Sequence, residues 1–276
     1  MKLAFIALVL GLGTGACVAD DPTSAGRVEG DVTNVGIATE VEIQAATGNE
    51  RVEAHALELG DLAKTRQSAL AFLARDLPLH VLVNNAGLAG QRDVTSDGFE
   101  IQFGVNHLGP FLFTTLLLDR LRESAPARIV NVSSTAHYDA KSGINYEAVR
   151  RSTQSLTALS EYAVSKLANV LFTKELTRRL DGTGVTTYAL HPGVVATDVW
   201  RRIPSPVAWV MKQFMLGPED GSATTLYCAA EPSLAGESGR YYDDCREKTP
   251  SRQAQDPALA ADLWTRSEAF AAAILK

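Results

Sequence analysis

The chain has 276 residues, a formal net charge of −6 and 46% hydrophobic residues. This length suffices for one large core, so we expect a single domain over residues 1–276. The basic residues are scattered, which argues against nucleic acid as a partner. The cysteines Cys17, Cys228 and Cys245 form no C-x-x-C pair, so no metal site is expected. Such a sparse, odd set is typical of reduced thiols, and we expect a cytoplasmic protein.

The amino-terminal segment, residues 1–38, has two interpretations. Residues 2–10 form an apolar run like a buried parallel strand, followed by a turn containing Gly11 and Gly15. Such a turn holds a pyrophosphate because the backbone and helix N-terminal amides can approach it. The segment also has the outline of a secretory signal that ends before Cys17. The downstream motifs favour the strand, whereas cleavage at Cys17 would make the protein an exported lipoprotein.

Apolar runs and helical patterns alternate along the rest of the chain. Apolar spacing of three and four predicts helices over residues 39–46, 63–74, 99–121 and 161–180. Strands are expected over residues 52–59, 79–83, 128–132 and 185–190. This alternation predicts an α/β fold, a Rossmann-like doubly wound parallel sheet covered by helices on both faces. Ligands bind such sheets at the carboxyl ends of the strands.

A proline-interrupted apolar segment lies near the carboxyl-terminal third. Residues 203–217 contain Pro204 and Pro206 among large apolar side chains. The composition fits a flap over a substrate pocket, which we assign to residues 200–218. It also fits a membrane-touching patch or the contact surface of a homo-oligomer, and ordinary packing is the commonest explanation.

Tyr162 and Lys166 stand four residues apart in a helical pattern, so they share one face about one turn apart. The pKa of a free tyrosine, about 10, is too high for efficient proton transfer at neutral pH, and a neighbouring ammonium lowers it. The pair is therefore a candidate acid/base. Tyr-x-x-x-Lys pairs are also common on exposed helix faces, so the spacing alone does not distinguish a catalytic pair from a surface pair.

Three further motifs accompany this pair: Asn84-Asn85-Ala86-Gly87, Gly104-Val105-Asn106-His107 and Ser133-Ser134. Together they resemble the short-chain dehydrogenase/reductase family over residues 39–270, and within it the retinol-dehydrogenase-like branch. The stretches that carry the likeness are QFGVNHLGPFLFT, RIVNVSS, YAVSKLANVLFTKEL and GVTTYALHPGVVATD. Members of the family bind NAD or NADP on a parallel sheet and interconvert alcohols and carbonyls with an Asn, Ser, Tyr, Lys tetrad.

The resemblance implies a role for each matching residue. Tyr162 would give the proton in reduction, and Lys166 would lower the pKa of Tyr162 and hold the nicotinamide ribose. Ser134 would orient the substrate oxygen, and Asn106 would position a water between Lys166 and solvent. The cofactor would be lined by residues that follow the strands, namely Gly11, Gly15, Glu58, Asn84, Ala86, Gly87, Tyr162, Lys166, Pro192, Gly193 and Thr197.

The first turn departs from the family pattern. Cys17 stands where the family has a glycine, and its side chain could crowd the pyrophosphate. No residue between positions 20 and 40 matches the one that selects the coenzyme, so NAD and NADP both stay open. Glu58 replaces the aspartate that contacts adenine in the family. We expect an oxidoreductase acting on a lipophilic alcohol, aldehyde or ketone; the alternative is a degenerate homologue that serves as a binding module.

Overall fold

The computed structural model describes residues 40, 43–193 and 218–276. The strands in these ranges are β1 Val81–Asn84, β2 Ala127–Val132, β3 Val185–His191, β4 Arg240–Asp243 and β5 Arg246–Glu247. Their order in the sheet is β1-β2-β3-β4-β5, with parallel pairing from β1 to β4 and antiparallel pairing of β4 with β5. The carboxyl ends of β1 to β4 therefore meet along one edge.

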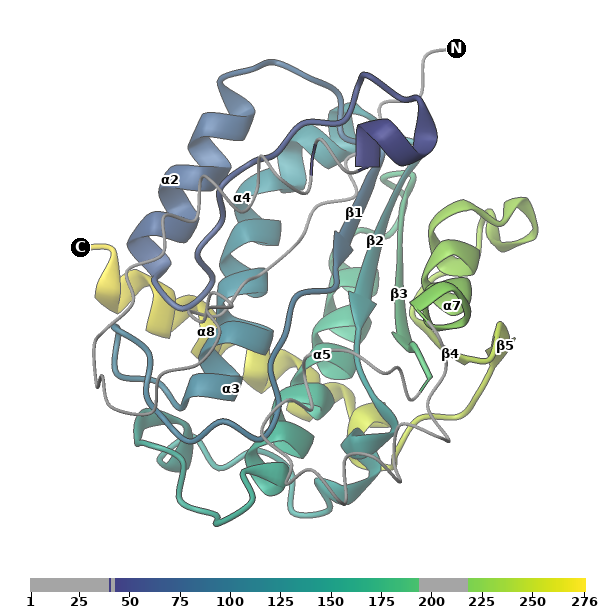
Figure 1. Cartoon of the computed structure of the whole chain (residues 1–276). Coiled ribbons are helices and arrows are strands. Elements are labelled where there is room, and N and C mark those ends of the chain that lie inside the picture. The colour runs from purple at the N-terminus through teal and green to yellow at the C-terminus, as the bar shows by residue number, and fades with distance from the viewer. Residues whose placement is uncertain (1–39, 41–42, 194–217) are drawn as a thin grey trace.

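Helices connect and cover these strands (Figure 1). They are α2 Leu62–Leu73, α3 Ile101–Phe103, α4 Gly109–Glu123, α5 Leu159–Arg179, α7 Pro218–Ala230 and α8 Pro257–Ile274. A π-helical turn, Gly104–Leu108, joins α3 to α4. Short 3-10 turns lie at Thr135–Asp139, Ala148–Arg150, Pro232–Leu234 and Gln253–Gln255.

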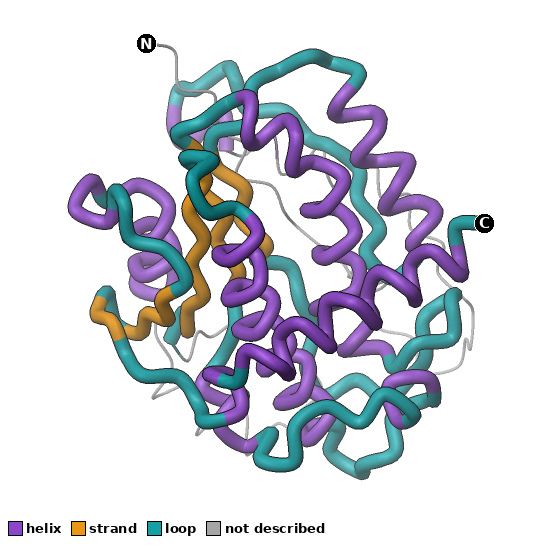
Figure 2. Tube along the Cα trace, turned by 180° about the vertical axis from the view of Figure 1, so that it is seen from behind, coloured by secondary structure: helices purple, strands orange, loops and turns teal. Residues whose placement is uncertain are grey.

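Alternate residues of the strands pack two separate cores, because successive side chains of a strand point to opposite faces. One core lies on the side of α7 and contains Val81, Val83, Val130, Val132, Tyr188, Leu190 and Tyr242. The other lies on the side of α4, α5 and α8 and contains Leu82, Ile129, Ala189 and Tyr241. Viewed from behind, α8 runs across α5 and α4 (Figure 2). The expected doubly wound α/β architecture is confirmed.

The helices expected over residues 63–74, 99–121 and 161–180 and the strands expected over 79–83, 128–132 and 185–190 are confirmed with small shifts at their ends. The expected first strand, residues 2–10, and residues 39, 41 and 42 of the expected first helix lie outside the described residues. The strand expected over residues 52–59 is wrong, because this segment forms no ladder with another strand in the part of the chain that the structure describes. Side chains of neighbouring helical residues bond its backbone instead. The Glu40 carboxylate accepts a hydrogen bond from Ala54 N at 2.7 Å, and Ser68 Oγ donates to the Ala56 carbonyl at 2.7 Å. Backbone groups satisfied in this way need no partner strand.

The helical stretch Ile101–Glu123 is the one part of the described residues that is long and apolar enough to cross a membrane. Within its most apolar window, 83% is buried inside the protein. Burial of this kind is typical of a core helix, and the helix packs against α2 and the sheet.

Candidate active site

Helix α5 places Tyr162 and Lys166 beside the carboxyl end of β2. Lys166 is only 4% exposed, and its Nζ donates to the Val132 carbonyl at 3.1 Å. The same nitrogen lies 5.5 Å from the centroid of the Tyr162 ring. The pair therefore faces the sheet, which rules out the exposed-face interpretation that the spacing alone left open.

Burial shifts the pKa values of the two side chains in opposite directions. It lowers the pKa of Lys166 to about 8, since the ammonium loses its hydration. It raises the pKa of Tyr162, while a hydrogen bond with Ser134 acts in the lowering direction. The net shift of Tyr162 is thus opposite to the one expected from Lys166 alone, because burial of the phenol is the larger effect. At neutral pH the pair is a protonated phenol beside an ammonium.

The two serines after β2 have different functions. Ser134 Oγ accepts a hydrogen bond from Ala136 N at 3.2 Å at the start of the 3-10 turn, and the Ser134 hydroxyl acts to lower the pKa of Tyr162. Ser133 Oγ donates to the Lys166 carbonyl at 2.7 Å and so anchors α5 to the sheet. Only the second serine of the pair therefore meets the phenol, in agreement with the position that the motif assigns to it.

Asn106 lies in the π-helical turn and is 1% exposed. Its Oδ1 accepts from Leu88 N at 2.8 Å, and its Nδ2 donates to the Leu88 carbonyl and to Ser165 Oγ, both at 2.9 Å. Ser165 Oγ in turn donates to the Tyr162 carbonyl at 2.8 Å. Asn106 therefore clamps the loop after β1 to α5. Both amide hydrogens are used by protein groups, so its role in holding a water stays a prediction.

The loop after β1 reaches the same place. At Gly87, an added Cβ would lie 3.1 Å from Asn106 Oδ1 and 3.5 Å from Lys166 Nζ. The absence of a side chain thus leaves the backbone directly beside the ammonium, which fits the close approach of a cofactor. Asn84 Nδ2 instead donates to Thr114 Oγ1 and Asn131 Oδ1, which ties the end of β1 to α4 and β2. Ala86 is half-buried against the core.

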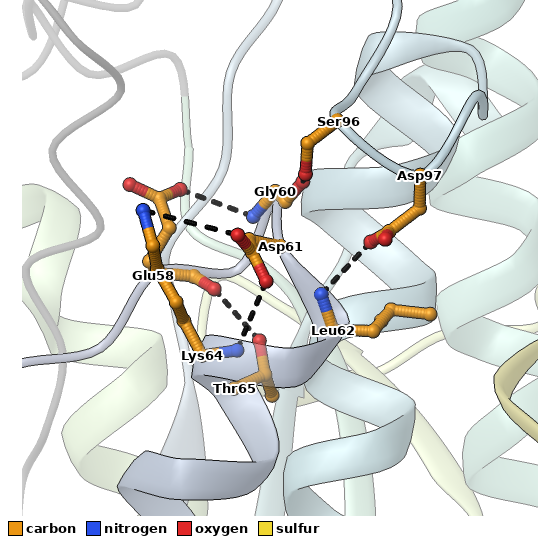
Figure 3. A network of polar contacts seen from close by, with 8 residues as sticks. All are labelled: Glu58, Gly60, Asp61, Leu62, Lys64, Thr65, Ser96 and Asp97. Atoms are coloured by element: carbon orange, nitrogen blue, oxygen red, sulfur yellow. Dashed lines mark hydrogen bonds and ion pairs between the residues drawn. The ribbon is translucent and has the colours of Figure 1, made fainter. Parts of the chain in front are cut away.

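Glu58 lies in the loop that leads into α2, and its half-buried carboxylate accepts from Gly60 N at 3.1 Å (Figure 3). The loop is bonded from outside by Ser96 Oγ, which donates to the Gly60 carbonyl at 3.0 Å. Asp97 accepts from Leu62 N at 2.8 Å, at the start of α2. The carboxylate expected to meet adenine is therefore carried by a well-bonded turn.

Helix α4 presses directly on this turn. A Cβ added to Gly109 would lie 2.4 Å from the Leu59 carbonyl oxygen and 3.0 Å from Leu59 Cα. Only a residue without a side chain allows this approach, so the backbone of α4 and the backbone of the Glu58 loop are in contact.

The end of β3 supplies the remaining described residues of the expected cofactor site. Pro192 and Gly193 follow directly after His191, and Gly193 has the left-handed φ of 86° that glycine accepts without strain. Gly11, Gly15, Thr197 and, up to residue 217, the expected flap over residues 200–218 lie outside the described residues.

The motifs did not reveal Gln102, a fully buried residue that also positions the site. Its Nε2 donates to the Ala158 carbonyl at 2.7 Å, and its Oε1 accepts from Gly90 N at 3.2 Å. Ala158 precedes α5 with a left-handed φ of 57°, and its carbonyl also accepts from Tyr162 N. Gln102 therefore fixes the beginning of the helix that carries the acid/base. A polar residue within the apolar QFGVNHLG stretch was the available signal.

A parallel sheet with a buried lysine, a half-buried tyrosine and a serine at its carboxyl edge defines a class, the nicotinamide-dependent oxidoreductases. Among the described residues, no cluster of three His, Cys, Asp or Glu side chains could hold a metal ion. The short chain dehydrogenase family model matches residues 31–159.

The chain is 44% identical to human retinol dehydrogenase 11 over 226 residues, which is 81% of this chain and 70% of the relative. It is 40% identical to human retinol dehydrogenase 13 over 238 residues, 82% of this chain and 70% of that protein. The chain therefore belongs to the short-chain dehydrogenase family, in its retinol-dehydrogenase-like branch. It is an oxidoreductase that uses NAD or NADP, as the sequence led us to expect.

Solved structures agree on the fold. An uncharacterised protein from Mycobacterium paratuberculosis superposes with a TM-score of 0.65 at 33% identity, covering 84% of this chain and 80% of that one. An NADPH-bound carbonyl reductase from chicken fatty liver superposes with a TM-score of 0.54 at 22% identity, covering 76% of this chain and 82% of that one. The second likeness concerns the fold alone.

Proposed function

We propose that the protein interconverts a lipophilic alcohol and its aldehyde or ketone, with Tyr162 as the acid/base. The observation that carries the proposal is the half-buried Tyr162 ring 5.5 Å from the buried Lys166 ammonium, with a Ser134 hydroxyl that acts to lower the pKa of the phenol. An alcohol oxygen must gain or lose a proton as hydride moves, and a phenol with a cation beside it can exchange that proton.

The substrate class is supported by two observations. The similar proteins named above are retinol dehydrogenases, and retinol is a long apolar alcohol. In addition, Leu156 and Leu159, shortly before Tyr162, are 87% and 49% exposed. Exposed apolar side chains in the segment that leads to Tyr162 favour an apolar substrate.

The mechanism assigns each step to a side chain. When bound, the nicotinamide supplies or accepts the hydride. In reduction the Ser134 hydroxyl orients the substrate oxygen, and Tyr162 gives that oxygen its proton. The Lys166 ammonium stabilises the resulting phenolate through its charge. Asn106 keeps the loop after β1 against α5, so that Gly87 stays beside Lys166.

The test is turnover of all-trans-retinal by Tyr162→Phe with NADPH and with NADH. Turnover is expected to fall by roughly 10²–10⁴-fold, since proton transfer is lost while the ring remains. Quenching of NADPH or NADH fluorescence on binding is expected to persist. Tyr146→Phe, which removes a phenolic oxygen beside Phe270, serves as the matched control and is expected to keep its activity.

Retention of most turnover in Tyr162→Phe would contradict the mechanism. Failure of the unaltered protein to bind either coenzyme would favour the degenerate binding module instead. The cytoplasmic location and the homo-oligomeric state stay predictions, which cell fractionation and light scattering of the purified protein would check.

A further inference from the structure

His137 lies three residues after Ser134 and is completely buried. Both of its ring nitrogens have partners. Nδ1 lies 2.6 Å from the Ser134 carbonyl oxygen, and Nε2 accepts a hydrogen bond from Ser251 N at 3.1 Å. The ring therefore joins the turn after β2 to the segment that precedes α8.

These partners define the tautomer of the imidazole. The backbone N–H of Ser251 can only donate, so Nε2 must present its lone pair. Nδ1 then carries the proton and donates it to the Ser134 carbonyl. Burial also lowers the pKa of His137, which keeps the ring in this neutral form.

Two tyrosines hold the plane of the ring. The centroid of Tyr138 lies 4.1 Å from that of His137, and the centroid of Tyr241 on β4 lies 4.8 Å away. Tyr138 is itself tied down, because its hydroxyl donates to the Thr249 carbonyl at 2.7 Å. An imidazole packed between these rings cannot turn away from Ser134 without disturbing both contacts.

We propose that His137 is a positioning residue that orients Ser134 toward Tyr162 by binding the Ser134 carbonyl. That carbonyl accepts from both His137 N, at 3.1 Å, and His137 Nδ1. Two donors on one oxygen fix the peptide plane after Ser134, and this plane directs the Cα–Cβ bond from which Oγ projects. The inference rests on the proposed function, since it concerns the hydroxyl assigned to the substrate oxygen.

Two substitutions separate the two hydrogen bonds of the ring. In His137→Asn, the amide nitrogen occupies the place of Nδ1 and can still donate to Ser134. In His137→Gln, the amide oxygen reaches the place of Nε2 and can still accept from Ser251, but the donor to Ser134 is lost. A residue that orients Ser134 requires the first contact, whereas a residue that only fastens the chain near Ser251 requires the second.

The experiment measures kcat for retinal reduction and the dissociation constant for NADPH in both variants. His137→Gln is expected to lower kcat about tenfold, and His137→Asn less than about threefold. The NADPH dissociation constant is expected to change less than about twofold in either. In a Ser134→Ala background, His137→Gln is expected to cause almost no further loss, because the residue that it orients no longer carries the hydroxyl.

Equal kcat values for the two variants, or the lower value in His137→Asn, would overturn the inference. So would loss of NADPH binding in both variants, since His137 would then support the fold in general. Tyr162→Phe is measured alongside them. If that variant stays active the proposed function fails, whereas an inactive Tyr162→Phe with indistinguishable His137 variants refutes the orienting role alone.

Discussion

The residues expected to meet the nicotinamide and those expected to meet the adenine are held in different ways. Around Lys166 the side chains are buried, and Asn106 bonds residues that lie 18 and 59 positions away in the chain. Around Glu58 the carboxylate is half-buried and bonds Gly60, two positions away. The key side chain at the nicotinamide end, Asn106, is thus held by distant residues, whereas the Glu58 carboxylate itself bonds only within its local turn, although Ser96 and Asp97 bond other parts of that turn. Changes at the first should affect turnover and stability together.

The largest expected effect comes from Asn106→Ala. The variant leaves Leu88 N, the Leu88 carbonyl and Ser165 Oγ without their partner in a buried place. We expect the free energy of unfolding to fall by about 3 kcal/mol, because unpaired buried polar groups keep their full desolvation cost. Turnover should fall with it, as the clamp on α5 is lost. Urea denaturation and retinal reduction measure the two effects.

Asn145→Ala is the matched control for this substitution. Asn145 is exposed, and its side-chain Oδ1 accepts hydrogen bonds from the nearby Glu147 N and Ala148 N. Its loss should cost about 1 kcal/mol or less. Equal destabilisation by the two substitutions would remove the distinction between a buried tertiary clamp and a local turn.

The second effect is a pH dependence of turnover, which should arise from the buried region around Lys166 and not from the Glu58 turn. Because the pKa of Lys166 is about 8, raising the pH above this value removes the ammonium that supports the phenolate. Retinal reduction should decline about tenfold per pH unit above it. Lys166→Arg should shift this decline to higher pH, because a guanidinium keeps its charge. A pH–rate profile that is flat to pH 10 would contradict the assignment.

Above pH 8, where turnover should fall, the free energy of unfolding should rise. Between pH 8 and 10.5, the unfolded chain keeps the Lys166 proton while the folded protein loses it. The unfolded state then binds more protons, so the free energy of unfolding rises with pH from this residue. Urea denaturation of the unaltered protein and of Lys166→Met, compared at pH 7 and 10, isolates this contribution.

The smallest effects are expected from alanine substitutions of two glycines, one in the region expected to meet the nicotinamide and one in the region expected to meet the adenine. In Gly87→Ala the new Cβ meets Asn106 Oδ1 at 3.1 Å, an oxygen fixed by Leu88. We expect about a tenfold loss of kcat, as the clamp must shift beside Lys166. In Gly60→Ala the Cβ meets Glu58 Oε1 at 3.3 Å, which belongs to a side chain that can move. There we expect less than about a twofold change in kcat. Similar losses of kcat in Gly87→Ala and Gly60→Ala would refute the contrast between the two regions.

Sequence patterns predicted the elements whose apolar faces are periodic. The long helix over residues 161–180 and the buried strands over 79–83, 128–132 and 185–190 all appear in the structure. The alternation over residues 52–59 was detected equally well, and Leu57 and Leu59 are indeed buried. Alternation reports which side chains are covered. It does not report whether the backbone pairs with a strand or, as here, with side chains such as those of Glu40 and Ser68.

The candidate site followed from motif spacing only in part. The structure brings Ser134, Tyr162, Lys166 and Asn106 to one edge of the sheet. Their distances along the chain do not predict that they lie close together. The upward shift of the Tyr162 pKa was missed, because the four-residue spacing of Tyr162 and Lys166 does not show how deeply the phenol is buried. Gln102 and His137 were missed for a related reason: each acts through a backbone carbonyl, and no residue pattern reports that partner.

The backbone contact between Gly109 and Leu59 has a consequence for the kind of molecule that fits. A coenzyme has a constant length, so the two regions expected to meet its ends must keep a constant separation. Helix α4 continues the helical stretch that contains Asn106, and it touches the turn that carries Glu58. The contact between Gly109 and Leu59 therefore sets the distance between these two regions. A methyl group at position 109 would meet the Leu59 carbonyl oxygen at 2.4 Å and push the two regions apart, so Gly109→Ala should weaken the binding of a coenzyme of unchanged length.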